Sequence, residues 1–178
     1  MKYLFLLIFV FLNSYQTEKE IHNFHLENQT IQYIKVFELK EFSENELIDK
    51  LNGYLPTVSG VSNIHFNGTV FTGKIENLEI DFKKYGGKWG TTWIPIQYPM
   101  NANLTIQVKD NRYRLLISNI ECSMQVPPRT VFDFNSMATV KRGTEISTNK
   151  TIVQGLKYTD QFLTDKFNIS NKQLDNDW

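Results

Sequence analysis

The sequence has very little cysteine and no excess of either charge. Cys122 is the only cysteine among 178 residues. No disulfide can therefore form within the chain, and the thiol is either a small buried apolar group or a free thiol able to pair between chains. Lys plus Arg and Asp plus Glu number 19 each. This balance provides no overall field for collecting nucleic acid or anionic lipid, so we expect no nucleic-acid partner.

Long apolar runs are also scarce. The one exception covers residues 3–12, which follow Lys2 and precede polar residues from Asn13 onwards. Ten residues span about 15 Å as a helix, half of a hydrocarbon core of about 30 Å. The pattern predicts a signal peptide over residues 1–14, cleaved near Ser14, and a mature chain without a transmembrane segment. We therefore expect an exported protein, periplasmic or extracellular.

The sequence lacks the compact motifs of catalysis and cofactor binding. Gly87-Lys88 is followed by Trp89, whereas a Walker-type loop requires Ser or Thr at that position. His22 and His25 stand in a short polar segment, where solvated histidines are commoner than metal ligands. We expect no cofactor and no metal. A catalytic site assembled from scattered polar residues remains an open alternative, because such partners meet in space rather than in sequence.

The hydrophobic pattern that is present predicts an α+β fold. Residues Ile31–Leu39 alternate and are rich in β-branched and aromatic side chains, which indicates a first strand. Ser43-Glu44-Asn45-Glu46 has the form of a capping box and predicts a helix from Glu44 to about Asn52. Apolar residues at helical spacing predict a last helix over residues 151–167, with Gly155 weakening its first turn.

Period-two alternation dominates between the two helices. A short hairpin is expected around Asn67-Gly68, joining residues 63–66 to 69–72, and a further strand over 78–82. Leu104–Lys109 and Arg112–Ile120, joined by Asp110-Asn111, form the strongest predicted hairpin. Residues 123–150 are expected to be an extended loop. The predicted organisation is a flexible segment over 15–29, one domain over 30–168 and a polar tail over 169–178.

The order strand, helix, several antiparallel strands, helix resembles a family of exported bacterial proteins with domain of unknown function 4468, which has a TBP-like fold. The resemblance covers about residues 30–122, and the stretch from Leu104 to Ile120 is similar to the family's most typical segment. It implies a curved antiparallel sheet with helices packed on one face. It implies no established activity.

The predicted sheet has one face that the helices leave open. In the strand Arg112–Ile120, side chains at alternate positions point to opposite faces. We assign Tyr113, Leu115 and Ile117 to the helix-covered face. The open face then carries a mixed cationic and apolar set of candidate binding residues: Arg112, Arg114, Leu116 and Ile120.

A second candidate is the stretch KKYGGKWGTTW, residues 83–93. Its cations and aromatic rings suit a stacking platform for a ligand. The competing and favoured interpretation is a glycine-rich connection whose aromatic side chains fold back on the sheet. The candidate residues of this aromatic and basic loop are Lys84, Tyr85, Lys88, Trp89 and Trp93.

Two functions follow as hypotheses. The favoured one is a non-enzymatic binding module of the cell envelope or extracellular space, whose open sheet face contacts an unidentified protein, another envelope component or a second copy of the chain. The alternative is a small exported hydrolase or transferase. A closed pocket that gathers a histidine with a carboxylate or hydroxyl would favour the alternative.

Overall fold

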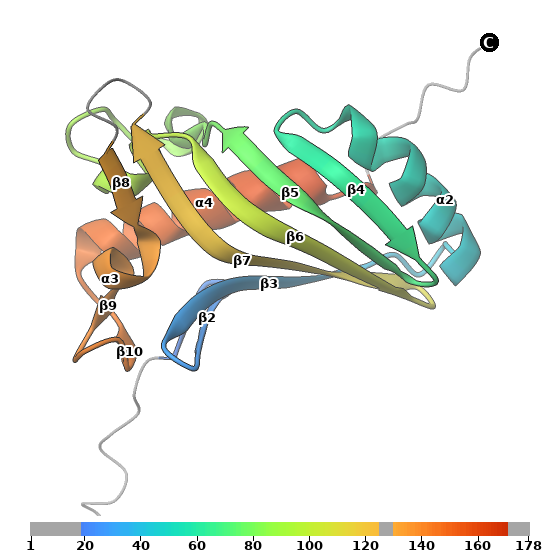
Figure 1. Cartoon of the computed structure of the whole chain (residues 1–178), viewed down its shortest axis with the longest axis horizontal. Coiled ribbons are helices and arrows are strands. Elements are labelled where there is room, and N and C mark those ends of the chain that lie inside the picture. The colour runs from blue at the N-terminus through green and yellow to red at the C-terminus, as the bar shows by residue number, and fades with distance from the viewer. Residues whose placement is uncertain (1–18, 125–129, 171–178) are drawn as a thin grey trace, which may run out of the picture.

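The computed structural model describes residues 19–124 and 130–170, and the predicted signal peptide lies outside them. An eight-stranded antiparallel sheet runs in the order β1-β2-β3-β7-β6-β5-β4, with β8 paired to β7. The strands are β1 (Glu20–Ile21), β2 (Phe24–Glu27), β3 (Thr30–Glu38), β4 (Val61–Asn67), β5 (Val70–Leu78), β6 (Met100–Lys109), β7 (Arg112–Met124) and β8 (Thr130–Asp133). The sheet is curved (Figure 1).

The two long helices lie on the same side of this sheet (Figure 1). They are α2 (Glu44–Tyr54) and α4 (Lys150–Phe167). The Tyr54 hydroxyl of α2 donates a hydrogen bond to the carbonyl of Lys166 in α4. The Tyr113 hydroxyl of β7 donates to the carbonyl of Phe167. The expected α+β architecture, a curved antiparallel sheet with helices on one face, is confirmed.

The apolar core lies between the sheet and these helices. Alternate residues of β6 and β7 are buried, as a sheet with one covered face requires. The predicted inward positions of β7 are confirmed, because Tyr113, Leu115 and Ile117 are fully buried. The first strand and both helices form within one or two residues of the predicted bounds. The two hairpins form around the predicted turns, but β5 continues to Leu78 instead of ending at residue 72, and β6 and β7 are each four residues longer than predicted.

A β-bulge in β7 overturns one assignment. Asn119 has φ 52°, and the β6–β7 register shifts between Asn101 and Asn103. Two residues of β7 therefore oppose one residue of β6, which reverses the alternation beyond the bulge. Ile120 is consequently buried on the helix-covered face, and its prediction as an open-face residue is wrong.

Three segments differ from expectation because apolar residues in them reach the core. Residues 20–27, expected to be flexible, form β1 and β2, and Phe24 packs on Tyr33 and Phe134. Residues 78–82 are not a separate strand, since β5 ends at Leu78 and a short 3-10 helix spans Phe82–Tyr85. The expected loop 123–150 contains β8, the helix α3 (Phe134–Ala138) and a small hairpin of β9 (Thr139–Val140) and β10 (Glu145–Ile146).

The predicted capping box opens α2. The backbone N–H of Ser43 donates to Glu46 Oε2 over 2.8 Å, and Ser43 Oγ accepts from the backbone N–H of Glu46. The first of these contacts lowers the pKa of the Glu46 carboxyl. We expect Ser43→Ala to destabilise the protein by about 1 kcal/mol, because a helix amide loses its acceptor. Urea denaturation measures this, and an unchanged midpoint and slope would exclude a stabilising cap.

The single cysteine is part of the core. Cys122 is fully buried in β7, which confirms its interpretation as a small apolar side chain. Burial raises the pKa of its thiol to about 12. The thiolate is the reactive form of cysteine, so we expect this buried group to react little in the folded protein at neutral pH.

Candidate functional site

The open face of the sheet carries the first candidate site, and the strand register fixes its layout. Arg112 of β7 lies between Glu38 of β3 and Lys109 of β6. Arg114 lies between Val36 and Gln107, and Leu116 lies between Ile34 and Thr105. Polar and charged groups thus occupy the end of the face nearest the β6–β7 turn, and aliphatic side chains follow.

A cavity of about 240 Å³ opens at that end of the face. We call it the hairpin pocket. Arg114 Nη2 donates to Gln107 Oε1 over 2.5 Å, which orients the guanidinium. Val36 supplies an apolar surface and is 48% exposed. The open-face residues that line the hairpin pocket are Val36, Gln107, Lys109, Arg112 and Arg114. Tyr113, between the two arginines, also borders it, although its side chain is buried on the helix-covered face.

The cations of the hairpin pocket have no carboxylate bound to them within the part of the chain that the structure describes. None of the ion pairs between residues 19–124 and 130–170 includes Lys109, Arg112 or Arg114. Lys109 and Arg112 stand directly opposite each other, an arrangement of like charges that destabilises a sheet. An anionic ligand group bound at this corner would offset the repulsion between these cations.

Sequence reasoning found part of this site and missed part. Arg112 and Arg114 line the hairpin pocket, and Leu116 is half-buried beside it on the same face. Lys109 and Gln107 were missed, although the Asp110-Asn111 turn places them opposite the two arginines. Val36 could not be found, because its place depends on the pairing of β3 with β7 across a long stretch of chain.

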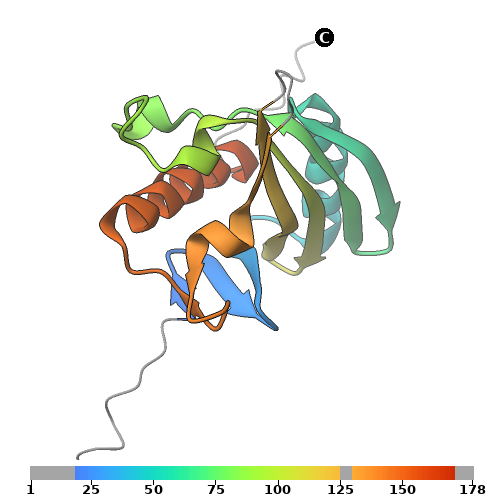
Figure 2. The same cartoon turned by 60° about the vertical axis from the view of Figure 1, so that its left-hand side comes forward.

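The aromatic and basic loop, the second candidate, does not form a shared stacking surface. Trp93 is buried against Phe134 and α4. Lys84 Nζ and Tyr85 Oη each lie 2.7 Å from Asp165 Oδ2, which ties the loop to α4 (Figure 2). Trp89 is 55% exposed, with its ring edge-on to Phe82. The loop is thus mainly a structural connection that folds back on α4.

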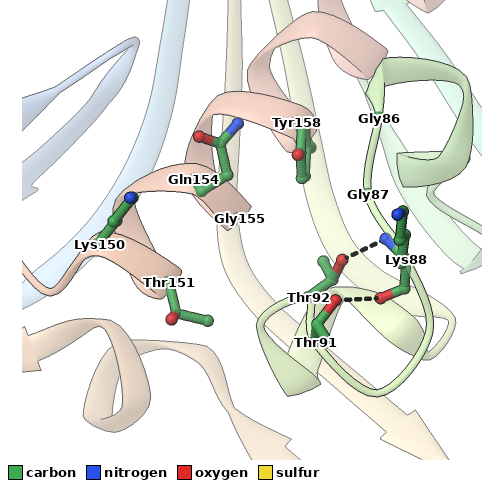
Figure 3. A pocket seen from close by; sticks show the side chains of 10 residues that line it. All are labelled: Gly86, Gly87, Lys88, Thr91, Thr92, Lys150, Thr151, Gln154, Gly155 and Tyr158. Atoms are coloured by element: carbon green, nitrogen blue, oxygen red, sulfur yellow. Dashed lines mark hydrogen bonds between the residues drawn. The ribbon is translucent and has the colours of Figure 1, made fainter.

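A cavity of about 230 Å³ lies between this loop and α4 (Figure 3). Lys88 lines it, together with Lys150, Gln154 and Tyr158. The amides of a phosphate-binding loop point at the ligand. Here they donate within the protein instead: Gly86 to Lys83 O, Gly87 to Phe82 O, Lys88 to Thr92 Oγ1, Gly90 to Gln97 Oε1, and Thr91 and Thr92 to Lys88 O. These backbone amides are therefore not available to bind a phosphate.

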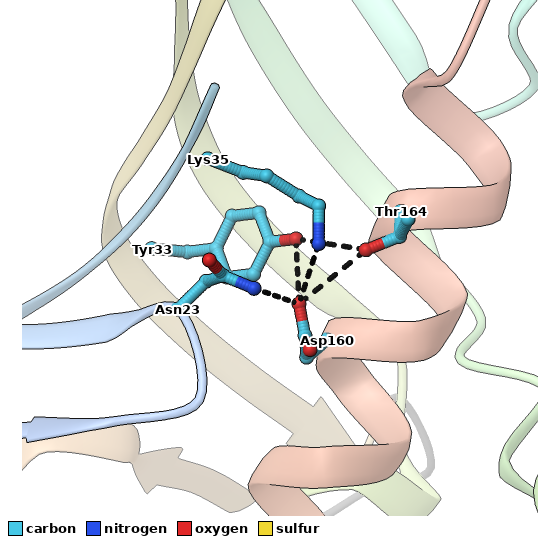
Figure 4. A network of polar contacts seen from close by, with 5 residues as sticks. All are labelled: Asn23, Tyr33, Lys35, Asp160 and Thr164. Carbon is cyan, nitrogen blue, oxygen red and sulfur yellow. Dashed lines mark hydrogen bonds and ion pairs between the residues drawn. The ribbon is translucent and has the colours of Figure 1, made fainter. Parts of the chain in front are cut away.

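A polar network lies between the sheet and α4 (Figure 4). Asp160 Oδ1 of α4 accepts hydrogen bonds from Asn23 Nδ2 over 2.6 Å and from Tyr33 Oη over 3.0 Å. Lys35 Nζ lies 3.6 Å from the same oxygen, and the Lys35 and Asp160 side chains are 22% and 16% exposed. Burial raises the pKa of Tyr33, so its hydroxyl remains a donor. The network joins β2 and β3 to α4.

Comparison with solved structures decides the fold. The chain superposes on a TBP-like protein from Parabacteroides distasonis ATCC 8503 with a TM-score of 0.54 and 15% identity, over 78% of this chain and 88% of that one. The chain has a TBP-like fold. A DUF4468 family protein from Bacteroides ovatus ATCC 8483 also matches, with a TM-score of 0.49 and 13% identity, over 79% of this chain and 84% of that one.

The TBP-like fold agrees with the resemblance stated from the sequence. No protein-family model matches the chain, and no curated protein matches it. At 15% identity the likeness establishes the architecture and carries no ligand or activity with it. Any function assigned to this TBP-like chain must therefore come from its own side chains.

Proposed function

We propose that this chain is an exported binding module that contacts a protein or another component of the cell envelope through the open face of its sheet. One observation carries the proposal. Helices cover one face of the sheet, and the other face leaves aliphatic side chains beside cations that form no ion pair with any other described residue. Exposed Val36 and half-buried Ile34 and Leu116 make up the aliphatic part. Mixed apolar and cationic surfaces of this kind are typical of partner-binding sites.

The hydrolase alternative required a pocket that gathers a histidine with a carboxylate or hydroxyl. Neither the hairpin pocket nor the cavity beside α4 includes a histidine, and two further cavities among the described residues also lack one. Among those residues there is also no group of three or more potential metal ligands. No observation therefore favours an enzymatic site, and the binding function is the one that the geometry supports best.

Leu116→Glu tests the open face. We expect the variant to fold and to lose association, because a carboxylate at the centre of the aliphatic part resists desolvation in an interface. Sedimentation velocity measures self-association, and a pull-down from envelope extract measures capture of partners. Both are compared with wild type at matched thermal stability.

Two further variants make the result decisive. Lys157→Glu places a carboxylate at an exposed position of α4, on the opposite side of the domain, with a larger change of net charge than Leu116→Glu because a cation is also removed. This variant should keep every association. Val36→Glu repeats the test at a side chain that is 48% exposed, in case Leu116→Glu unfolds the domain. If the folded open-face variants keep all associations of the wild type, the proposal is wrong.

Export is the second part of the proposal and rests on the apolar run at residues 3–12. No helix within the described residues has the length and apolar character needed to cross a bilayer. We expect the mature protein to begin near Tyr15 and to be recovered from a soluble envelope or extracellular fraction. Amino-terminal sequencing of the fractionated protein measures this, and intact Met1 in the cytosolic fraction would contradict it.

A further inference from the structure

The hairpin pocket places three cations within reach of one ligand group. Arg112 and Arg114 are two residues apart on β7, which spaces their side chains about 7 Å along the same face. Lys109 stands opposite Arg112 on the neighbouring strand, about 5 Å away. Two acids adjoin this corner: Glu38 lies opposite Arg112 across the β3–β7 ladder, and Asp110 lies in the turn between β6 and β7. Neither forms an ion pair with the three cations among the described residues.

The size of the pocket limits the ligand. A cavity of about 240 Å³ is below the range of about 300–1,000 Å³ typical of drug-sized ligands. It suits one side chain or one small charged group. Arginine recognises a carboxylate through paired N–H donors, and the bond to Gln107 occupies only part of the Arg114 guanidinium.

A long polyanion fits this face poorly. Beyond the hairpin pocket the same face carries Glu76 and Glu121, and the whole chain is neutral. Nucleic acids are bound through rows of phosphate contacts, which need a continuous cationic track. On this face three cations instead cluster at one end, and Lys74 of β5 lies apart from them beside Glu76.

Aliphatic side chains begin one residue pair beyond the cations. Leu116 is two residues from Arg114 and lies beside Ile34. In an extended peptide, side chains two residues apart point to the same side and are about 7 Å apart. An acidic residue and an aliphatic residue at that spacing therefore match the pocket and the neighbouring aliphatic surface.

We propose that the hairpin pocket binds the carboxylate of an acidic residue in an extended segment of a partner protein, while an aliphatic residue two positions away packs on Ile34 and Leu116. This inference rests on the proposed function and specifies the partner chemistry of the same face. The occupant is thus an acidic peptide segment.

A synthetic peptide tests the inference. The probe is acetyl-Ser-Glu-Ser-Leu-Ser-amide, titrated into the full mature chain and followed by the amide NMR shifts of residues 107–116. We expect saturable shifts in these residues. Replacing glutamate with glutamine in the peptide should weaken binding about tenfold or more, because a charge-assisted contact is lost. The same loss is expected for Arg112→Gln/Arg114→Gln with the glutamate peptide.

Lys74→Gln is the matched control. Lys74 is an exposed cation of the open face, but it lies outside the hairpin pocket and donates to Asn103. This variant should bind the glutamate peptide as the wild type does. Raising NaCl from about 50 to about 200 mM should weaken binding of the glutamate peptide and not of the glutamine peptide.

Several results would overturn the inference. Equal binding of the two peptides, unchanged binding to the double variant, or shifts confined to other residues would each do so. Inorganic phosphate is titrated separately, and if it displaces the peptide at equal concentration the pocket is a general anion site rather than a peptide site. These outcomes differ from failure of the proposed function, which appears as unchanged association of Leu116→Glu and Val36→Glu.

Discussion

Asp160→Ala is expected to destabilise the protein by about 3 kcal/mol. Removing this carboxylate leaves Lys35 as an unpaired cation between the sheet and α4. Asn23 loses its acceptor, and the Tyr33 hydroxyl keeps only its contact with Thr164 Oγ1. Breaking a buried ion pair by removing one partner costs roughly 3–5 kcal/mol, and the partial exposure of both side chains places this case at the lower end. Urea denaturation followed by circular dichroism measures the loss.

Asp165→Ala provides the control for this prediction. Asp165 stands on the same helix and accepts hydrogen bonds from Lys84 and Tyr85. Its side chain is 53% exposed and that of Lys84 is 56% exposed, so solvent screens the pair. We expect a loss below about 1 kcal/mol. If the two variants lose the same free energy of unfolding, burial of the Asp160 network adds nothing to the stability of the protein.

Gly155→Ala is expected to destabilise the protein by about 2 kcal/mol, which is opposite to the usual effect of this substitution in a helix. Alanine in place of glycine normally stabilises a helix by about 1 kcal/mol. Here the added Cβ would lie 2.7 Å from Trp93 Cβ and 2.9 Å from Trp93 Cε3. Overpacking of this kind costs roughly 1–3 kcal/mol or more, and backbone positions must shift to relieve it. The midpoint of urea denaturation, compared with that of the wild type, shows whether the substitution destabilises or stabilises the protein.

The same substitution in a Trp93→Ala background isolates the cause. Trp93→Ala alone should be destabilising, since it removes a buried ring that packs on Phe134. In that background Gly155→Ala should become neutral or stabilising, because the overlap is gone and the helix propensity remains. A destabilisation of the same size in both backgrounds would rule out contact with Trp93 as the reason.

Local signals in the sequence predict much of the fold. The Ser43 cap, the Asp110-Asn111 turn and the alternation of the two strands beside it each act within a few residues. The helix α4 is likewise predictable from a local signal, the helical spacing of its apolar residues. The sequence marks Gly155 only as a weak helix former, since the close approach of Trp93 from a distant loop leaves no signal in the residues around Gly155.

The bulge in β7 is a feature that the sequence could have revealed. The buried apolar residues of this strand are 113, 115 and 117, followed by 120 and 122, so the alternation shifts by one residue. Asn119 marks the shift, because asparagine tolerates positive φ better than most residues. The assignment of Ile120 failed because alternation was extended through a position where it had already changed.

Other parts of the structure were beyond local reasoning. Residues 20–27 and 130–138 join the domain because Phe24 and Phe134 stack on each other, although they are far apart in the sequence. The Asp160 network likewise combines side chains from β2, β3 and α4. The sequence predicts only the β6–β7 side of the hairpin pocket, because a local turn brings those two strands together. The β3 side depends on a pairing between residues far apart in the sequence, which no local signal indicates.

The burial of Cys122 makes the chain a ready host for site-specific labelling. The thiol of Cys122 is enclosed in the core, and burial raises its pKa to about 12. We therefore expect maleimides not to modify it at neutral pH, whereas an exposed cysteine with a pKa of about 8.5 reacts readily. Thr72→Cys would place one reactive group on the open face, at an exposed position of β5 away from the hairpin pocket. A fluorophore or spin label attached there would report on whatever approaches that face, with no need to remove the natural cysteine first.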